Sequence, residues 1–282
     1  MKHGLILFLL LAGSSVGLHA EDARPVVDAS NLTDEAAADT SLPTLYLVGD
    51  STVRIGGASS EMIGWGERIL PYFDSKKINV VNKAIGGRSA RTFYTEGRWD
   101  DVEKALRPGD VVIIQFGHND QGRIGDPANK HRADGRGTGP ETVPDTMPDG
   151  SIEQVHTFGW YMAHFVKTAR AREATVILCS PIPHKDRWES DRDFSDIASW
   201  DRQVADEHGA LFLDLTLVIT DAYHVVGKQA VEGFFADQRT HTNEDGAVFN
   251  AECVIAGLKS LPGDPLAPYY SRQGQAVQRH GN

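Results

Sequence analysis

Leu45-Tyr46-Leu47-Val48-Gly49-Asp50-Ser51 joins an apolar run to a short polar turn. Four consecutive apolar residues are typical of a short strand that is buried on both faces of a sheet. Glycine and aspartate directly after such a run favour a sharp turn. A serine on that turn is presented at the end of the strand, where a ligand can reach it. We therefore interpret Ser51 as a candidate nucleophile at the edge of a sheet.

Similar apolar runs recur along the chain and alternate with helix-like stretches. The runs are Leu45–Val48, Ile78–Val81, Val111–Phe116, Thr175–Leu178 and Ala210–Leu213. The helix-like stretches are Trp65–Phe73, Val102–Leu106, Val155–Arg172, Phe194–His208 and Asp245–Lys259. Buried runs separated by helices are the pattern of parallel strands with helices on both faces. The sequence therefore predicts a doubly wound α/β fold.

The carboxyl ends of the predicted strands carry the candidate chemistry. In open parallel sheets the ligand site lies outside those ends. Gly49-Asp50-Ser51 and Gly117-His118-Asn119 each directly follow a predicted strand, so both fall at that edge. The stretch 121–150 is rich in Gly, Pro and Asp, and we expect it to be a loop that lines the substrate site. Asp214 also follows a strand, but aspartate is common at helix starts, so we assign it no chemical role.

Composition limits the classes of function. The 282 residues suffice for one sizeable domain, and 39 acidic against 28 basic residues give a net charge of −11. This balance argues against nucleic-acid binding, which needs a basic surface. Cys179 and Cys253 are the two cysteines; we expect buried small apolar side chains, with a single disulfide left open.

The two ends of the chain are predicted to lie outside the folded domain. Residues 1–20 have the basic start, apolar run and small-residue end of a secretory signal peptide, with cleavage after Ala20, which predicts a secreted or periplasmic protein. No later segment reaches the roughly 18 apolar residues of a membrane span. We expect a flexible leader at 21–43, one domain at 44–262 and a poorly ordered tail at 263–282.

A serine hydroxyl needs a base within hydrogen-bond reach, and histidine suits that task because it titrates near neutrality. His241 precedes a helix-like segment near the C-terminus, and Asp237 lies four residues before it. Residues four apart share a face if the segment forms a helical turn. Asp237 could then hold one ring nitrogen of His241 while the other faces Ser51.

Acyl transfer also needs donors that face the developing oxyanion. The backbone N–H of Ser51 is available at the turn. Gly87 suits a loop that directs its N–H inward, and the side-chain amide of Asn119 can supply a third donor. His118, directly before it, is interpreted as a packing or supporting residue.

Taken in order, these motifs resemble those of the SGNH hydrolases, also called the GDSL-like family, and among them the rhamnogalacturonan acetylesterases. The four name-giving residues would be Ser51, Gly87, Asn119 and His241. The matching segments are Gly49–Val53, Asn82 with Gly86–Arg91, Gly117–Asp120, Val155–Tyr161 and Thr240–Thr242.

The resemblance implies a three-layer α/β/α fold with a five-stranded parallel sheet. It also implies removal of acetyl groups from plant cell-wall polysaccharide, usually pectin, without a metal or other cofactor. Ser51 would be the nucleophile and His241 the base and then the acid. Ser51, Gly87 and Asn119 would form the oxyanion hole. Arg88 and Arg91 either bind uronic-acid carboxylates of the substrate or tether loops through salt bridges.

One departure and several alternatives remain. The family places its orienting aspartate three residues before the histidine, but that position is Gln238 here, so we favour Asp237 for the role. A metallophosphoesterase is disfavoured because no Asp-x-His motif precedes Gly49. An acetylxylan esterase, an SGNH lipase or thioesterase, and a carbohydrate-binding protein without turnover stay open.

Overall fold

The computed structural model describes residues 38–54, 61–189 and 192–281. The predicted signal peptide at 1–20 and the leader up to residue 37 lie outside the described residues, so both stay predictions. No helix within the described ranges combines the length and apolar character that crossing a membrane requires.

The last residues of the predicted leader are attached to the domain. The guanidinium of Arg107 donates hydrogen bonds to the carbonyl oxygens of Thr40, at 2.6 Å, and Leu42, at 3.0 Å. The backbone N–H of Asp39 donates to Oδ1 of Asn79 at 3.1 Å. These contacts hold the chain in place just before the first strand.

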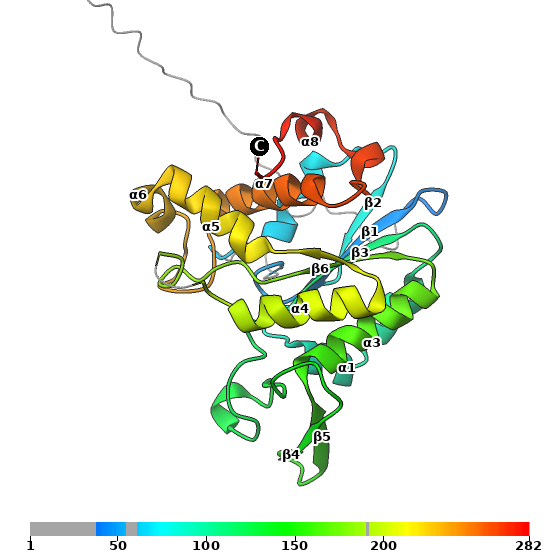
Figure 1. Ribbon diagram of the computed structural model, residues 1–282, viewed down its shortest axis with the longest axis vertical. Helices are drawn as coiled ribbons and strands as arrows, with labels where there is room; N and C mark the ends of the chain where they lie inside the picture. Colours follow the sequence, from blue (N-terminus) through cyan, green and yellow to red (C-terminus); the bar gives the residue numbers. More distant parts are fainter. Residues whose placement is uncertain (1–37, 55–60, 190–191, 282) are drawn as a thin grey trace, which may run out of the picture.

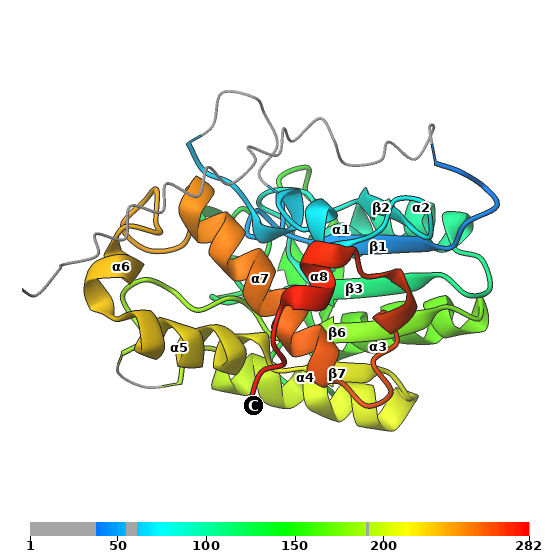
Figure 2. The same cartoon turned by 90° about the horizontal axis from the view of Figure 1, so that it is seen from above.

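Five parallel strands form the central sheet in the order β2-β1-β3-β6-β7 (Figures 1 and 2). The strands are β1 (Thr44–Gly49), β2 (Asn79–Asn82), β3 (Val111–Gln115), β6 (Thr175–Cys179) and β7 (Leu211–Leu213). All five predicted runs are therefore strands of one sheet. In the register of β1 and β3, Leu45 lies opposite Val111 and Gly49 opposite Gln115. The strand order reverses at β1, and this switch point is where ligands bind in such sheets.

Helices cover both faces of the sheet and give three layers (Figure 1). The helices are α1 (Ala90–Thr95), α2 (Arg98–Ala105), α3 (Phe158–Ala171), α4 (Ser195–His208), α5 (Leu215–Val226), α6 (Lys228–Glu232), α7 (Glu244–Ser260) and α8 (Arg272–Ala276). Along β1, Leu45 and Leu47 pack in a core with α5 and α7, whereas Tyr46 and Val48 pack in a second core with α1, α2, α3 and α4. Alternate side chains of one buried strand thus fill two cores, which confirms the predicted α/β/α fold.

Cys179 and Cys253 are both buried, unpaired thiols. The expectation of buried small side chains is confirmed, and the open alternative of a disulfide is not realised in the structure.

Several predicted boundaries were wrong. The stretch 65–73 forms two short 3₁₀ turns, η3 (Trp65–Glu67) and η4 (Leu70–Tyr72), because Pro71 lacks the N–H that a longer helix needs. The stretch 155–172 begins as a strand, β5 (Ile152–His156), which pairs with β4 (Thr142–Thr146) in a hairpin at one end of the molecule (Figure 1). Helix α5 was missed; it starts at Leu215, and the carboxylate of the preceding Asp214 caps it by accepting from the N–H of Leu217 at 3.2 Å.

The C-terminal segment is folded, contrary to the expectation of a poorly ordered tail. Leu266 and Tyr270 are buried in the core that also contains α7. Lys259 of α7 donates hydrogen bonds to the carbonyl oxygens of Gly274, Gln275 and Val277. The segment therefore closes one side of the domain, with η6 (Ala267–Tyr269) and α8 in contact with the body of the protein.

Gly49 is the last residue of β1 and lies opposite Gln115 of β3, directly before the turn that carries Ser51. A Cβ atom at this position would lie 2.6 Å from the carbonyl oxygen of Gln115 and 2.7 Å from Cγ2 of Val53. We expect Gly49→Ala to lower the free energy of unfolding by about 1–3 kcal/mol, because overpacking forces backbone shifts. Urea unfolding of both proteins measures this, and equal stabilities would contradict it.

Candidate active site

The turn after β1 is held in shape by its own side chains and by β3. Oδ1 of Asp50 accepts hydrogen bonds from the backbone N–H and the hydroxyl of Thr52, both at 2.8 Å. The buried amide of Gln115 donates to Oγ1 of Thr52 at 2.7 Å and accepts from Nε1 of Trp65 at 2.9 Å. Because buried polar groups need partners, this network fixes the position of Ser51 between Asp50 and Thr52.

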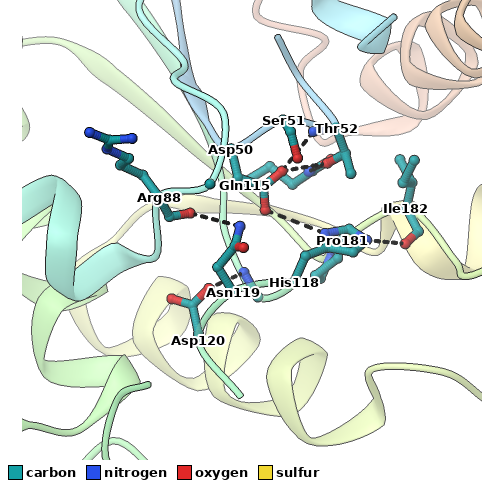
Figure 3. Close-up of polar contacts among 12 residues, drawn as sticks. Asp50, Ser51, Thr52, Arg88, Gln115, His118, Asn119, Asp120, Pro181 and Ile182 are labelled. Atoms are coloured by element: carbon teal, nitrogen blue, oxygen red, sulfur yellow. Dashed lines mark hydrogen bonds and ion pairs between the residues drawn. The ribbon is translucent and has the colours of Figure 1, made fainter. Parts of the chain in front are cut away.

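His118, in the loop after β3, links this turn to the segment after β6 (Figure 3). Its Nδ1 lies 3.4 Å from Oδ2 of Asp50, and its Nε2 donates to the carbonyl oxygen of Ile182 at 3.1 Å. The Asp50 carboxyl is fully buried, and burial alone would raise its pKa. The charge and hydrogen bonding of His118, with the bonds from Thr52, outweigh burial and lower that pKa. His118 therefore holds the turn of Ser51 in place, which agrees with its interpretation as a supporting residue.

Ser51, His241 and Asp237 form a hydrogen-bonded chain. Oγ of Ser51 lies 2.9 Å from Nε2 of His241, although the two residues are 190 positions apart in the sequence. Nδ1 of His241 lies 2.5 Å from Oδ2 of Asp237. A carboxylate can only accept, so Nδ1 carries the proton and Nε2 is the acceptor for the serine hydroxyl. This arrangement can remove the Ser51 proton as its oxygen attacks a carbonyl carbon.

Asp237 reaches His241 through a bend and not through the helical turn that we expected. Its Oδ1 accepts the backbone N–H groups of Arg239 at 2.8 Å, Thr240 at 2.7 Å and His241 at 3.1 Å. Partial burial would raise the pKa of Asp237, but these backbone bonds and the His241 ring outweigh it and lower the pKa to about 2. The exposed Gln238 takes no part in these contacts. The carboxylate thus shapes the loop and orients the ring together.

The loop that carries His241 is anchored on both sides. The backbone N–H of Ile63 donates to the carbonyl oxygen of Thr242 at 2.8 Å, and the Thr242 hydroxyl donates back to Ile63 at 2.7 Å. Directly after it, the Asn243 side chain caps α7 by accepting from Gly246. His241 is therefore positioned by the segment before η3 and by the start of α7.

The loops of Gly87 and Asn119 are joined to the strand end that carries Ser51 and to each other. The N–H of Ile85 donates to the carbonyl oxygen of Gly49 at 3.0 Å, which lays the loop of Gly87 along the end of β1. Nδ2 of Asn119 donates to the carbonyl oxygen of Arg88 at 3.1 Å, which brings the loop after β3 to the same place (Figure 3). Within the described ranges, the backbone N–H groups of Ser51 and Gly87 and the second amide proton of Asn119 have no protein acceptor. These donors can receive an oxyanion.

Arg91 was wrongly considered as a substrate-binding residue. Its side chain is fully buried, and its guanidinium pairs with Asp145 and Glu153, both at 2.8 Å. It also donates to the carbonyl oxygen of Ala133 at 3.0 Å. Arg91 therefore tethers α1 to the β4–β5 hairpin, which was the other interpretation. Arg88 is partly exposed and pairs with Glu96 at 3.0 Å.

Arg132, in the long stretch after β3, is a further residue of the site that the sequence pattern does not reveal. Its Nη1 donates to Oδ1 of Asn119 at 2.8 Å and lies 3.5 Å from the carbonyl oxygen of Gly87. The stretch lacks periodicity, so nothing in the sequence distinguishes Arg132 from the other arginines there. Its contacts become visible only when the loop is placed in space.

A pocket of about 190 Å³ opens beside the loops of Asn119 and His241. Residues from both loops line it, among them Asp120 and Arg239. Its other lining side chains come from the stretch 134–136 and from the segment around α4, and they include His184, Arg187, Arg192 and Trp200. In the part of the chain that is described, no group of three His, Cys, Asp or Glu side chains is placed to hold a metal ion.

Two buried carboxyl groups, Asp120 and Asp134, lie under the loop of Asn119. Asp120 accepts the backbone N–H groups of Ala90 at 2.7 Å and Gly117 at 2.8 Å. Neither carboxyl oxygen of Asp134 has a hydrogen-bond partner within the described ranges. Burial first, and then the charge of Asp50, raise the pKa of Asp120 to about 6. Burial first, and then the charge of Asp120, raise the pKa of Asp134 well above its usual range. The pair therefore retains a proton near neutral pH.

We expect this pair to make the protein less stable as pH rises. The folded state binds more protons than the unfolded state above about pH 4, so stability falls as pH rises through 6. Asp134→Asn removes one titrating group and should lessen the stability lost between pH 5 and pH 8. Urea unfolding at both pH values measures this. The exposed Asp206→Asn is the matched control, and an Asp134→Asn protein with the wild-type pH dependence would refute the argument.

The chain is similar to known proteins of one family. The GDSL-like lipase/acylhydrolase family matches residues 47–248. The rhamnogalacturonan acetylesterase of Emericella nidulans is 33% identical over 219 residues, covering 76% of this chain and 84% of that protein. The probable rhamnogalacturonan acetylesterase YesY of Bacillus subtilis is 31% identical over 229 residues, covering 79% and 94%.

Solved structures agree on the fold. The protein YxiM of Bacillus subtilis is 25% identical with a TM-score of 0.62, over 84% of this chain but only 58% of that longer one. The acetylxylan esterase Axe2 of Geobacillus stearothermophilus is 20% identical with a TM-score of 0.51, over 76% and 92%, and shows the fold alone. The chain belongs to the GDSL-like lipase/acylhydrolase family and is an SGNH-type carboxylic ester hydrolase similar to rhamnogalacturonan acetylesterases.

Proposed function

We propose that this protein is a secreted serine esterase that removes acetyl groups from plant cell-wall polysaccharide, with acetylated rhamnogalacturonan as its substrate. The observation that carries the proposal is the chain from Ser51 through His241 to Asp237, with contacts of 2.9 and 2.5 Å. Two relatives that are named rhamnogalacturonan acetylesterases support the substrate. The signal-like residues 1–20 support export.

In the first half of the reaction, Oγ of Ser51 attacks the carbonyl carbon of a sugar acetyl group while Nε2 of His241 takes its proton. The negative charge that develops on the acetyl oxygen is received by the N–H groups of Ser51, Gly87 and Asn119. The protonated Nε2 then donates to the sugar oxygen as the ester bond breaks. The deacetylated sugar leaves, and the acetyl group remains on Ser51.

In the second half, a water molecule gives one proton to Nε2 of His241 and attacks the acetyl-serine. Collapse of the adduct returns that proton to Oγ of Ser51 and releases acetic acid, which ionises to acetate. Asp237 stays ionised throughout, since its pKa is about 2. Its negative charge stabilises the protonated His241 that forms in both halves.

The pocket beside the site supports an anionic polymer as substrate. Its walls carry several arginine side chains in a protein of net charge −11: Arg136, Arg187, Arg192 and Arg239. Each lies near an aspartate, but the pairs of Arg136 with Asp196 and of Arg239 with Asp186 are exposed on both sides and therefore weak, so a uronate carboxylate can compete for these two arginines. These arginines replace Arg91 as candidates for contact with a pectic chain.

We expect the wild-type protein to release acetate from acetylated rhamnogalacturonan faster than from acetylxylan, also in the presence of a chelator. Ser51→Ala should lower the rate of acetate release by at least about 10⁴-fold, because no other group can act as the nucleophile. An acetate assay on both polymers measures this. Release that survives Ser51→Ala would refute the mechanism, and a preference for acetylxylan or for octanoyl esters would refute the substrate.

We expect Asp237→Asn to lower kcat by about 10³- to 10⁴-fold, because it removes the charge that stabilises the protonated His241. The substitution leaves an acceptor for the backbone N–H groups of the bend. The neighbouring exposed Gln238→Ala is the matched control and should stay within about threefold of wild type. Acetate release under saturating substrate checks both, and a larger loss in Gln238→Ala would contradict the assignment.

A further inference from the structure

We propose that Arg132 is the positioning residue of the oxyanion hole. Its guanidinium holds the Asn119 side-chain amide and the Gly87 carbonyl. This keeps the free amide proton of Asn119 and the backbone N–H of Gly87 directed at the acetyl oxygen. This inference rests on the proposed function, since it assigns a residue that acts through the donors of that site.

The hydrogen bonds determine which way the Asn119 amide points. A guanidinium only donates and a carbonyl oxygen only accepts. The atom that faces Nη1 of Arg132 at 2.8 Å must therefore be Oδ1, and the atom that faces the carbonyl of Arg88 at 3.1 Å must be Nδ2. One amide proton is used by Arg88, and the second is left for the substrate. Without Arg132, the amide could rotate and present its oxygen to the oxyanion.

The same guanidinium reaches the second loop of the hole. Nη1 of Arg132 lies 3.5 Å from the carbonyl oxygen of Gly87, a residue with a left-handed φ of +76°. Together with the bond from Asn119 to Arg88, this contact closes a ring of residues 87, 88, 119 and 132. The two donor loops are therefore held to each other and not only to the sheet.

Arg132 is itself held in place by an unusual backbone. Its Nε donates to the carbonyl oxygen of Asn129 at 2.8 Å. Lys130 and His131 are both left-handed, each with φ of 55°, a conformation that is strained for residues other than glycine. His131 is fixed by Asp145, whose carboxylate lies 3.0 Å from its Nδ1. The strained turn brings the chain back from η5 (Pro127–Asn129) so that Arg132 reaches the site.

The positive charge of Arg132 is not paired with an acidic side chain in the described part of the chain. No carboxylate in the described ranges lies within 4.0 Å of its guanidinium, whereas Arg88 and Arg91 each pair with at least one. A positive charge bonded to Oδ1 polarises the amide and makes the remaining N–H of Asn119 a stronger donor. This effect grows as negative charge develops on the acetyl oxygen, so it acts on the transition state.

The test is a double-mutant cycle with Arg132→Met and Asn119→Ala, measured with 4-nitrophenyl acetate. This neutral ester excludes a role for Arg132 in binding a uronate. We expect Arg132→Met to lower kcat by about 10- to 100-fold and to change KM less than threefold, since removal of a whole donor costs about 10²- to 10³-fold. In the Asn119→Ala background, the same substitution should have an effect at least about threefold smaller, because only the contact with the Gly87 carbonyl is left to lose.

Arg123→Met is the matched control, because Arg123 is an exposed arginine of the same loop with the same charge; it should retain wild-type kcat. Arg132→Lys keeps the charge and should fall between wild type and Arg132→Met, which tests the role even if the Met variant unfolds. An equal loss in both Asn119 backgrounds, or a loss confined to KM on rhamnogalacturonan, would overturn the inference. Full activity of Asn119→Ala would overturn the oxyanion hole itself, whereas Ser51→Ala separately tests the nucleophile.

Discussion

The pairing of β1 with β3 is the constraint on which the site depends. Parallel register places Gly49 opposite Gln115, so the two strands end at the same level and their turns lie side by side. The buried Gln115 amide then needs partners, and it finds them in Thr52 and Trp65. Ser51 lies two residues after the end of β1, and Asn119 lies four residues after the end of β3. Their proximity is therefore a consequence of backbone pairing, before any side chain of the site makes a contact.

The base, His241, lies 190 positions after Ser51 in the sequence, so separate contacts must hold it in place. A loop is a poor place for a catalytic group unless the surrounding structure holds it rigidly. Thr242 bonds to Ile63, and Asp237 binds three backbone N–H groups as well as the ring of His241. One carboxylate thus organises the loop and sets the tautomer. Mutating it affects shape and charge together, which is why an isosteric amide separates the two contributions.

The elements that could be predicted from the sequence are those marked by an uninterrupted run of apolar residues. Five apolar runs gave the five strands, because strands buried on both faces allow few polar residues. Pattern failed where contacts between distant segments decide the structure. The hairpin of β4 and β5 has mostly exposed side chains and no alternation to recognise. Asp237 was identified by its spacing from His241, but the spacing suggested a helical turn, whereas the carboxylate itself folds the segment into a bend.

The arginines show most clearly why residue type and nearness in sequence do not assign a role. Arg91 lies four positions after Gly87, yet its charge is buried and matched by two carboxylates, as a guanidinium without solvent requires. Arg132 lies 45 positions after Gly87 and contacts it, with neutral carbonyl oxygens as its partners. A buried and compensated charge can tether segments, but it adds little field at the reacting atoms. A charge bonded only to neutral dipoles still acts on them, and those dipoles face the place where the substrate becomes negative.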